Sequence, residues 1–332
     1  MRTFLSCSLA IALVGAALVI AFMGRAAQAD QPAEVRLGYF PNLTHAQAVL
    51  GVFSGDFQRA LGPDTQLVPE KFNAGPALVS ALLAGDVDVA YVGPGPALTA
   101  WAQTNGQVIR VVAGAAANGV VIVARQGSGI KTLADLAGKR IATPQHNNTQ
   151  DISARHYVTA VLNQDDDSNV IPIPNAQQSG LMLDGKIDAA WAPEPWGSRL
   201  VAEAHGTIIG EEKDLWPGKE FSLTVIIVRQ DFLRDHPDVV EKILQVNRDW
   251  TLKLQSHPQD YVQPLSDALF DLTHARLSNP VISQALTHVK FTDDPIEKTF
   301  PVMAQWMLDL GVVRRPIHVD GLVDVSMLQQ LK

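Results

Sequence analysis

Five loops in this sequence place small, neutral hydrogen-bonding residues where an apolar strand ends and a helix is expected to begin. They are Pro41–Thr44, Asn73–Pro76, Gly93–Pro96, Gln145–Asp151 and Pro193–Trp196. None of the five contains Lys or Arg. The first turn of a helix has free N–H groups and the positive end of the helix dipole, which together favour an anion. The residue types therefore predict reversible capture of a small oxyanion without a fixed positive charge.

The candidate ligand-binding residues lie in or beside these loops. They are Asn42, Thr44, His45, Asn73, Ala74, Gly75, Gly93, Pro94, Asn118, His146, Asn147, Thr149, Gln150, Glu194 and Trp196. Some have a second interpretation: Asn73 and Thr149 fit plain helix caps, and a lone histidine such as His45 or His146 fits a packing or surface position. The prediction depends on the convergence of five loops rather than on any one residue.

Glu194 is unexpected in an anion site. One interpretation pairs it with Arg199 one helical turn later, and the other lets it hold an ammonium group on the ligand. Trp196 follows Pro195 and fits either a pocket wall or the core, whereas Trp191 ends an apolar strand and fits the core.

No catalytic motif accompanies the loops. The sequence has no His-x-x-x-His pair, no Gly-x-Ser-x-Gly elbow and no Gly-rich phosphate loop. Two histidines a hundred residues apart are a weak metal signal. We therefore expect a binding protein rather than an enzyme, with no cofactor and no metal.

An internal repeat positions the loops. Residues 83–94 and 183–194 share Gly, Asp, Ala and an aromatic residue in register. With a gap of two residues, the similarity extends back to Asn73-Ala74 and Asn175-Ala176. Each copy reads as a helix end, a buried strand and a loop. In an open α/β sheet such loops lie at the ligand-binding edge, and two similar lobes face each other across a cleft.

The first 29 residues are typical of a secretory signal peptide. Arg2 precedes the apolar run 4–22, and Ala27-Gln28-Ala29 provides a cleavage site. A membrane anchor is the alternative, because the apolar run approaches spanning length. The single cysteine, Cys7, lies in this leader, so the mature chain has no disulfide or cysteine site.

The charge balance bounds the partners. The chain has 26 Lys and Arg against 34 Asp and Glu, a net charge of −8, and both leader charges are arginines, so the mature part is more acidic still. This balance argues against nucleic acid and against an anionic membrane surface.

The chain is expected to cross between the lobes twice, at Ala115–Asn118 and near Phe221–Thr224. The predicted organisation is a signal peptide at 1–29, a first lobe from 30–116 and 222–332, and a second lobe from 117–221. The helical tail after Pro237 is expected to close back onto the first lobe.

With these residues in view, nearly the whole mature chain resembles the substrate-binding proteins of ABC importers for aliphatic sulfonates, taurine and nitrate. The sequence segments that show the resemblance are Val35–Ala46, Phe72–Pro76, Ala84–Gly93, Leu133–Lys139, Ala142–Pro144, Asn148–Asp151 and Pro193–Trp196. The resemblance implies a two-lobed α/β fold of the periplasmic-binding type (type II-like), with C-terminal helices on the first lobe and the ligand clamped at the hinge. It implies pocket positions at Asn42, Asn73–Gly75, Gly93 and the turn Asn147–Gln150. His146-Asn147 departs from the small or apolar residues common in sulfonate binders.

The sequence and the resemblance together predict a periplasmic, monomeric solute-binding protein. It would deliver a small organic anion, an aliphatic sulfonate first, to an ABC permease with its ATPase. The alternatives are a nitrate- or taurine-type binder, a binder of a thiamine-pyrimidine precursor, and, from another class, an enzyme on the same bilobed fold.

Overall fold

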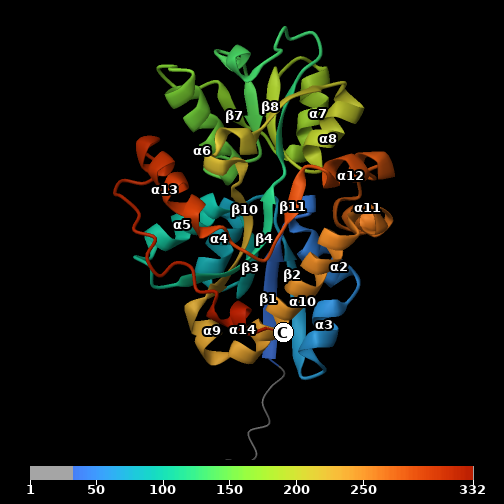
Figure 1. Ribbon diagram of the computed structural model, residues 1–332, viewed down its shortest axis with the longest axis vertical. Coiled ribbons are helices and arrows are strands. Elements are labelled where there is room, and N and C mark those ends of the chain that lie inside the picture. Colours follow the sequence, from blue (N-terminus) through green and yellow to red (C-terminus); the bar gives the residue numbers. More distant parts are fainter. Residues whose placement is uncertain (1–32, 332) are drawn as a thin grey trace, which may run out of the picture.

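Two separate β-sheets form the centres of two α/β lobes that are stacked end to end (Figure 1). The computed structural model describes residues 33–331. The first sheet has the strand order β11-β4-β10-β3-β1-β2, and the second has the order β7-β6-β8-β5-β9. The predicted two-lobed α/β architecture is therefore present, whereas the predicted leader at 1–29 lies outside the described residues.

The strands of the first sheet are β1 (Ala33–Tyr39), β2 (Thr65–Lys71), β3 (Val89–Val92), β4 (Ile109–Asn118), β10 (Ser222–Arg229) and β11 (Val289–Phe291). Those of the second are β5 (Val120–Ala124), β6 (Ile141–Thr143), β7 (Val170–Pro172), β8 (Ala189–Pro193) and β9 (Thr207–Glu211). In each sheet three strands are parallel, β2-β1-β3 and β7-β6-β8, and an antiparallel strand, β10 or β5, pairs with the third. The sequence repeat thus corresponds to a repeat of sheet topology.

An Arg–Asp pair recurs at the same place in both copies. In the first sheet Arg36 donates from Nε and Nη2 to the two carboxylate oxygens of Asp88, at 2.9 and 2.7 Å. In the second sheet Arg140 donates to Asp188 in the same way, at 2.9 Å for both bonds. The backbone N–H of each arginine also donates to its aspartate. Asp88 therefore ties β1 to the start of β3, and Asp188 ties the start of β6 to the start of β8.

The chain changes sheet where β4 meets β5, with Gly119 alone between them. Ala116 and Ala117 still pair with β10 and β11, and Asn118 still pairs with β11, so the chain leaves the first sheet at Asn118-Gly119, where φ is positive at both residues. The return segment runs beside it, because the Asn118 N–H donates to the Phe221 carbonyl at 3.1 Å. The lobe boundaries at 116/117 and 221/222 remain our proposed division of the chain.

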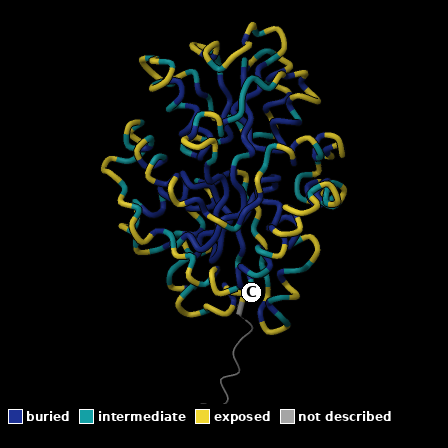
Figure 2. Tube along the Cα trace, in the orientation of Figure 1, coloured by how far each residue is buried: buried dark blue, intermediate teal, exposed yellow. Residues whose placement is uncertain are grey.

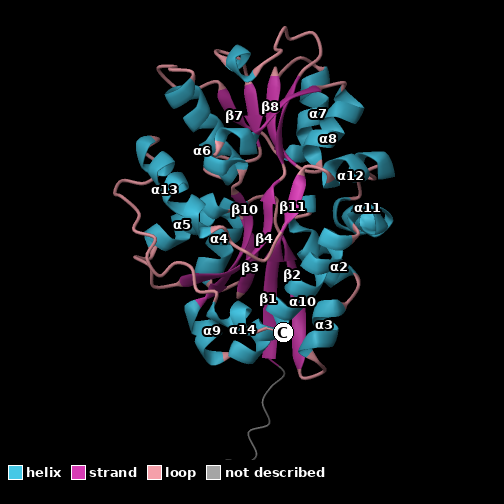
Figure 3. Cartoon of the chain, in the orientation of Figure 1, coloured by secondary structure: helices cyan, strands magenta, loops and turns pink. Residues whose placement is uncertain are grey.

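Helices cover the faces of both sheets (Figure 3). The α-helices are α2 (Ala46–Phe53), α3 (Asp56–Leu61), α4 (Gly75–Ala84), α5 (Pro94–Gln103), α6 (Thr149–His156), α7 (Asn175–Leu183), α8 (Trp196–Ala204), α9 (Gln230–Asp235), α10 (Pro237–Ser256), α11 (Val262–Thr273), α12 (Asn279–Leu286), α13 (Phe300–Asp309) and α14 (Ser326–Gln330). Short 3₁₀ turns span Leu43–His45, Leu133–Leu136, Glu212–Leu215, Pro217–Lys219, Pro258–Tyr261 and Glu297–Thr299, and a π turn spans Tyr157–Val161.

The C-terminal helices pack mainly on the first lobe and also reach the second. Helix α10 lies against α2 and α3, and α11 lies against α2. Helix α12 contacts α8, and α13 contacts both α5 and α6. The tail therefore lies along the interface between the lobes as well as on the first sheet.

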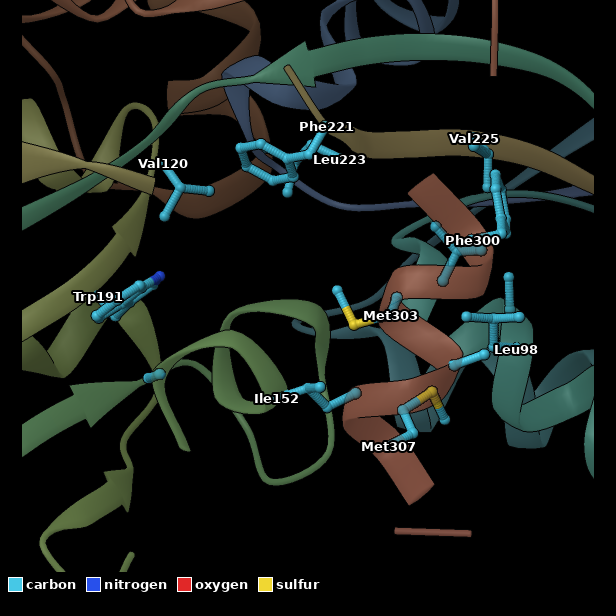
Figure 4. Packing of buried hydrophobic residues seen from close by; sticks show 14 of the residues in the cluster. Leu98, Val120, Ile152, Trp191, Phe221, Leu223, Val225, Phe300, Met303 and Met307 are labelled. Carbon is cyan, nitrogen blue, oxygen red and sulfur yellow. The ribbon is translucent and has the colours of Figure 1, made fainter. Parts of the chain in front are cut away.

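The buried residues follow the two sheets (Figure 2). One apolar cluster includes residues of both lobes: Trp191 and Ile152 belong to the second lobe and Leu98 to the first, and α13 with Met303 and Met307 lies between Ile152 and Leu98 (Figure 4). Each lobe has a further cluster on the opposite face of its sheet. No helix within residues 33–331 has the length and apolar character needed to cross a membrane.

Candidate functional site

A small pocket lies where the loops of the two lobes meet. Its walls are Phe40, Asn42, Thr44, His45, Asn73, Ala74, Gly75, Gly93, Pro96, Pro144, Asn148, Thr149, Gln150, Asn175, Pro193, Leu223 and Thr224. None of these residues is Lys, Arg, Asp or Glu. The pocket is built instead from neutral polar side chains, prolines, backbone and helix ends.

His45 is a neutral hydrogen-bond donor in this pocket. Its ring is buried, and burial lowers the pKa of His45 to about 3. Its Nδ1 accepts the backbone N–H of Phe40 at 3.3 Å. Because a backbone amide can only donate, the single ring hydrogen of the neutral imidazole must be on Nε2. His45 therefore has an N–H to offer and no charge.

Asn42 is oriented in a similar way. Its Oδ1 accepts the indole N–H of Trp196 at 2.6 Å. An indole N–H has no acceptor capacity, so the amide oxygen must face Trp196 and the amide NH₂ points elsewhere. No protein partner for that NH₂ is present among residues 33–331. Asn42 therefore contributes donors to the pocket that it lines.

A chain of three bonds orients Gln150. The backbone N–H of Asp151 donates to Asn148 Oδ1 at 2.9 Å, which caps α6 and leaves Asn148 Nδ2 as a donor. Asn148 Nδ2 then donates to Gln150 Oε1 at 3.0 Å. The acceptor end of Gln150 is thereby used, and its NH₂ remains available.

Three helices begin at the pocket. Helix α4 starts at Gly75, α5 at Pro94 and α6 at Thr149, and neither α4 nor α5 has a side-chain cap. Because Pro76, Pro94 and Pro96 have no N–H, the first-turn amides that these two helices can offer are those of Gly75, Ala77 and Gly95. One is used between the lobes: the Gly95 N–H donates to Thr149 Oγ1 at 3.3 Å. Because that hydroxyl accepts, its own hydrogen remains free to donate.

The lobes approach each other closely at this point. A Cβ atom at Gly93 would lie 2.2 Å from Thr149 Oγ1, so position 93 has no room for a side chain. The backbone at Gly93 is ordinary, with φ −73° and ψ 155°. Glycine is therefore required here by the approach of the second lobe and not by backbone conformation.

The structure brings nine of the fifteen predicted site residues together as pocket walls. They are Asn42, Thr44, His45, Asn73, Ala74, Gly75, Gly93, Thr149 and Gln150. Thr224 adds a buried hydroxyl that has no partner among the described residues.

Six predicted residues do not line the pocket. Pro94 begins α5 beside it. Asn118 accepts the Phe221 N–H at 3.3 Å at the crossing. Asn147 accepts from Arg155 at 3.3 Å, and the His146 side chain is 60% exposed with its Nδ1 3.3 Å from Asp151. Glu194 is buried next to the wall residue Pro193, and Trp196 lines the wider opening that adjoins the pocket.

Glu194 is fully buried, and its carboxylate is turned toward the start of α8. It accepts from the Ser198 N–H at 3.0 Å and from the Ser198 hydroxyl at 2.9 Å. Burial raises the pKa of Glu194 to about 7. Of the two interpretations of Glu194, the pairing with Arg199 is not present, because Arg199 pairs with Glu203 at 2.6 Å, and Glu194 is not among the pocket walls either.

Some pocket walls were missed in the sequence, and their signals differ. They are Phe40, Pro144, Asn175, Leu223 and Thr224, whereas the walls Pro96, Asn148 and Pro193 lie inside the predicted loops. Asn175 occupies the position of Asn73 in the repeat, so the repeat could have identified it. Leu223 and Thr224 come from β10, an apolar strand far along the chain, and nothing in their spacing marks them.

A wider opening adjoins the pocket. It shares Asn42, Asn73, Ala74, Pro144 and Asn175 with the inner site. Phe72, Trp196 and Leu272 are among its other walls. Within the described part of the chain, no group of three or more His, Cys, Asp or Glu side chains could hold a metal ion.

Two α/β lobes with a neutral pocket between their facing loops define the fold class of the periplasmic binding proteins. The chain belongs to the NMT1-like family, whose model matches residues 28–251. A putative binding protein of Brucella abortus (strain 2308) is 27% identical over 328 residues, which cover 95% of each chain.

Two solved structures have the same fold. The alkanesulfonate-binding protein SsuA from Xanthomonas axonopodis pv. citri, bound to MOPS, has a TM-score of 0.72 at 20% identity, and the match covers 89% of this chain and 99% of that one. The periplasmic nitrate-binding protein NrtA from Synechocystis PCC 6803 has a TM-score of 0.73 at 15% identity, with 90% and 88% covered. The predicted family and the predicted fold are both confirmed.

Proposed function

We propose that this protein is the exported solute-binding component of an ABC importer and that it captures a small organic anion, an aliphatic sulfonate first. The family, the putative binding protein of Brucella abortus and the shared fold of SsuA and NrtA support this proposal. It acts in the periplasm as a monomer after removal of residues 1–29, and it performs no reaction. Its partners are a permease and the ATPase that drives it.

One observation carries the choice of ligand class. Asn42, Gln150 and His45 could each donate or accept, and in each the acceptor atom is already occupied by an internal N–H. These three side chains therefore present donors to the contents of the pocket. A sulfonate head has three acceptor oxygens and no hydrogen to donate, so it complements this arrangement.

Neutral donors make capture reversible. A hydrogen bond from a neutral donor to an anionic ligand is charge-assisted and therefore stronger than one between neutral groups. When the ligand leaves, no charged side chain remains buried without a partner. Closure of the lobes on the ligand would form the surface that the permease recognises.

The other small anions are the second candidates, since nitrate also has three acceptor oxygens and NrtA shares the fold. The test is a melting-temperature screen with methanesulfonate, ethanesulfonate, taurine, nitrate, phosphate and a neutral aminopyrimidine. A ligand at a hundred times its Kd stabilises the native state by about 2.7 kcal/mol. We expect the alkanesulfonates to give the largest shifts.

Taurine discriminates within the sulfonates. Because no carboxylate lines the pocket, its ammonium group finds no charged partner there. We therefore expect taurine to bind more weakly than ethanesulfonate. Stabilisation by the aminopyrimidine alone would overturn the anion proposal.

A further inference from the structure

One hydrogen bond at the pocket wall joins the two lobes through side chains. Trp196 begins α8 in the second lobe, and its Nε1 lies 2.6 Å from Oδ1 of Asn42 in the first. Both residues are only 6% exposed. The Arg199 guanidinium lies over the indole ring, 5.5 Å from its centroid.

The neighbouring backbone holds this contact in register without help from either side chain. The Leu43 N–H donates to the Glu194 carbonyl at 3.2 Å, one residue after Asn42 and two before Trp196. The loops before η1 (Leu43–His45) and α8 are therefore aligned by main chain. The hydrogen bond from the Trp196 indole to Asn42 is therefore not needed to align the loops, and its effect is on the orientation of the Asn42 amide.

That direction decides what the pocket offers. Asn42 has a carbonyl oxygen at one end of its amide and an NH₂ at the other, and the two ends have nearly the same shape. With the oxygen held by Trp196, the NH₂ faces the pocket. Without that bond, the amide can turn over and present an oxygen, which repels the oxygens of an anion.

We propose that Trp196 is a positioning residue: as the lobes close, its indole N–H fixes the Asn42 amide so that the pocket presents a donor. This inference rests on the proposed function and adds to it a source of specificity. The second lobe selects acceptor-only ligands by acting through a residue of the first, and the indole itself does not have to touch the ligand.

The test is a double-mutant cycle on methanesulfonate affinity, measured by titration calorimetry. Trp196→Phe keeps the ring and removes the N–H, and we expect a three- to tenfold weaker Kd, about the value of one neutral hydrogen bond. In an Asn42→Ala background the same change should have less than a twofold effect, because the group through which it acts is gone.

A second variant reads the direction of the amide. Asn42→Asp keeps an oxygen for Trp196 but turns a carboxylate oxygen toward the pocket, so methanesulfonate binding should fall more than a hundredfold. The matched control is Trp101→Phe, which removes an indole bond of 2.7 Å to the backbone carbonyl of His318, neither residue being a pocket wall, and it should leave Kd unchanged. Melting of the unliganded proteins reports whether each variant folds.

The outcomes separate the two proposals. If wild-type protein binds no sulfonate in calorimetry, the proposed function fails and this inference falls with it. If wild type binds but Trp196→Phe has the same effect with and without Asn42, Trp196 acts as an independent wall and the inference alone is overturned. Binding that tolerates Asn42→Asp would also overturn it.

Discussion

At the scale of single residues, the site works by fixing which end of each ambivalent group faces the ligand. Thr149 is the clearest case, because its hydroxyl accepts the Gly95 N–H of the opposite lobe and keeps its own hydrogen for the pocket. It thus contributes both to lobe closure and to ligand binding.

Thr149→Val should therefore weaken sulfonate binding by about ten- to a hundredfold, the value of a hydrogen bond to a charged group. Valine keeps the shape and removes the hydroxyl. Thr149→Ser is the matched control and should remain within about threefold of wild type in titration calorimetry. Equal affinities for the Val and Ser variants would contradict this role.

Glu194 is a buried carboxyl whose pKa is raised from 4.5 to about 7 in the folded protein. Between these two pH values the folded state holds a proton that the unfolded state has lost. The contribution to stability is fully present below pH 4.5 and is lost as pH rises through about 7. Glu211 and His288 face it at the lobe interface, at 3.4 Å from each other and with His288 3.9 Å from Glu194.

Glu194→Gln should remove the part of this pH dependence that comes from Glu194, while Glu212, whose pKa burial also raises to about 7, keeps its own part in both proteins. Ser198 can serve the amide as well, because its N–H donates to the new oxygen and its hydroxyl can accept from the new NH₂. Between pH 5 and pH 8 the wild type should lose up to about 3 kcal/mol more unfolding free energy than the variant. Urea unfolding at both pH values measures this, and parallel losses in the two proteins would disprove it.

At the scale of elements, the repeated aspartates Asp88 and Asp188 hold strands together and do not line the pocket. Asp188 receives two side-chain bonds and one backbone bond from Arg140, and this pairing holds the pKa of Asp188 well below its usual range. The bond joins β6 to the start of β8 and so sets the edge from which the pocket loops of the second lobe emerge.

Asp188→Asn should lower stability by about 1–2 kcal/mol at pH 7, since Arg140 is 43% exposed and part of the charge is screened. Because the folded pKa is lowered, this contribution is present above about pH 4 and is lost as pH falls further. The control is Asp184→Asn, an exposed position four residues earlier. Urea unfolding should show the loss in the first variant alone.

The repeat explains how much of the fold the sequence could predict. Apolar runs such as Val89–Val92, which Gly93 follows, and Ala189–Pro193, which ends in Pro, are short, buried strands, and local pattern suffices to find them. Local pattern cannot pair β10 with β3 and β4 across a hundred residues, so Leu223 and Thr224 were missed as pocket walls. One interpretation of the sequence paired Glu194 with the charged Arg199, whereas in the structure the neutral Ser198 is its partner.

At the scale of the whole molecule, closure depends on two helix starts meeting without side chains in the way. Gly93 and Gly95 lie on one side, and Thr149 lies on the other. The same contact closes one end of the pocket, so the final approach of the lobes and the shape of the site are set together.

Gly93→Ala should hold the lobes apart. Its Cβ would meet Thr149 Oγ1 at 2.2 Å, whereas the backbone angles at this position suit alanine. We expect a sulfonate affinity at least about tenfold weaker and a radius of gyration, from small-angle X-ray scattering, that no longer decreases when ligand is added. Gly180→Ala, with no atom within 4 Å of the new Cβ, is the control and should close as wild type does.

The strand order also determines when each sheet can be completed. Strand β10 lies between β3 and β4 in the first sheet, yet every strand of the second sheet precedes it in the chain. At 5–20 residues per second, a ribosome needs roughly 5–20 s for the hundred or so residues between β4 and β10. During that interval β3 and β4 each have an open edge, which invites pairing with other chains. The order of emergence is the same from a ribosome or from an export channel, so the sheet that begins first is finished last.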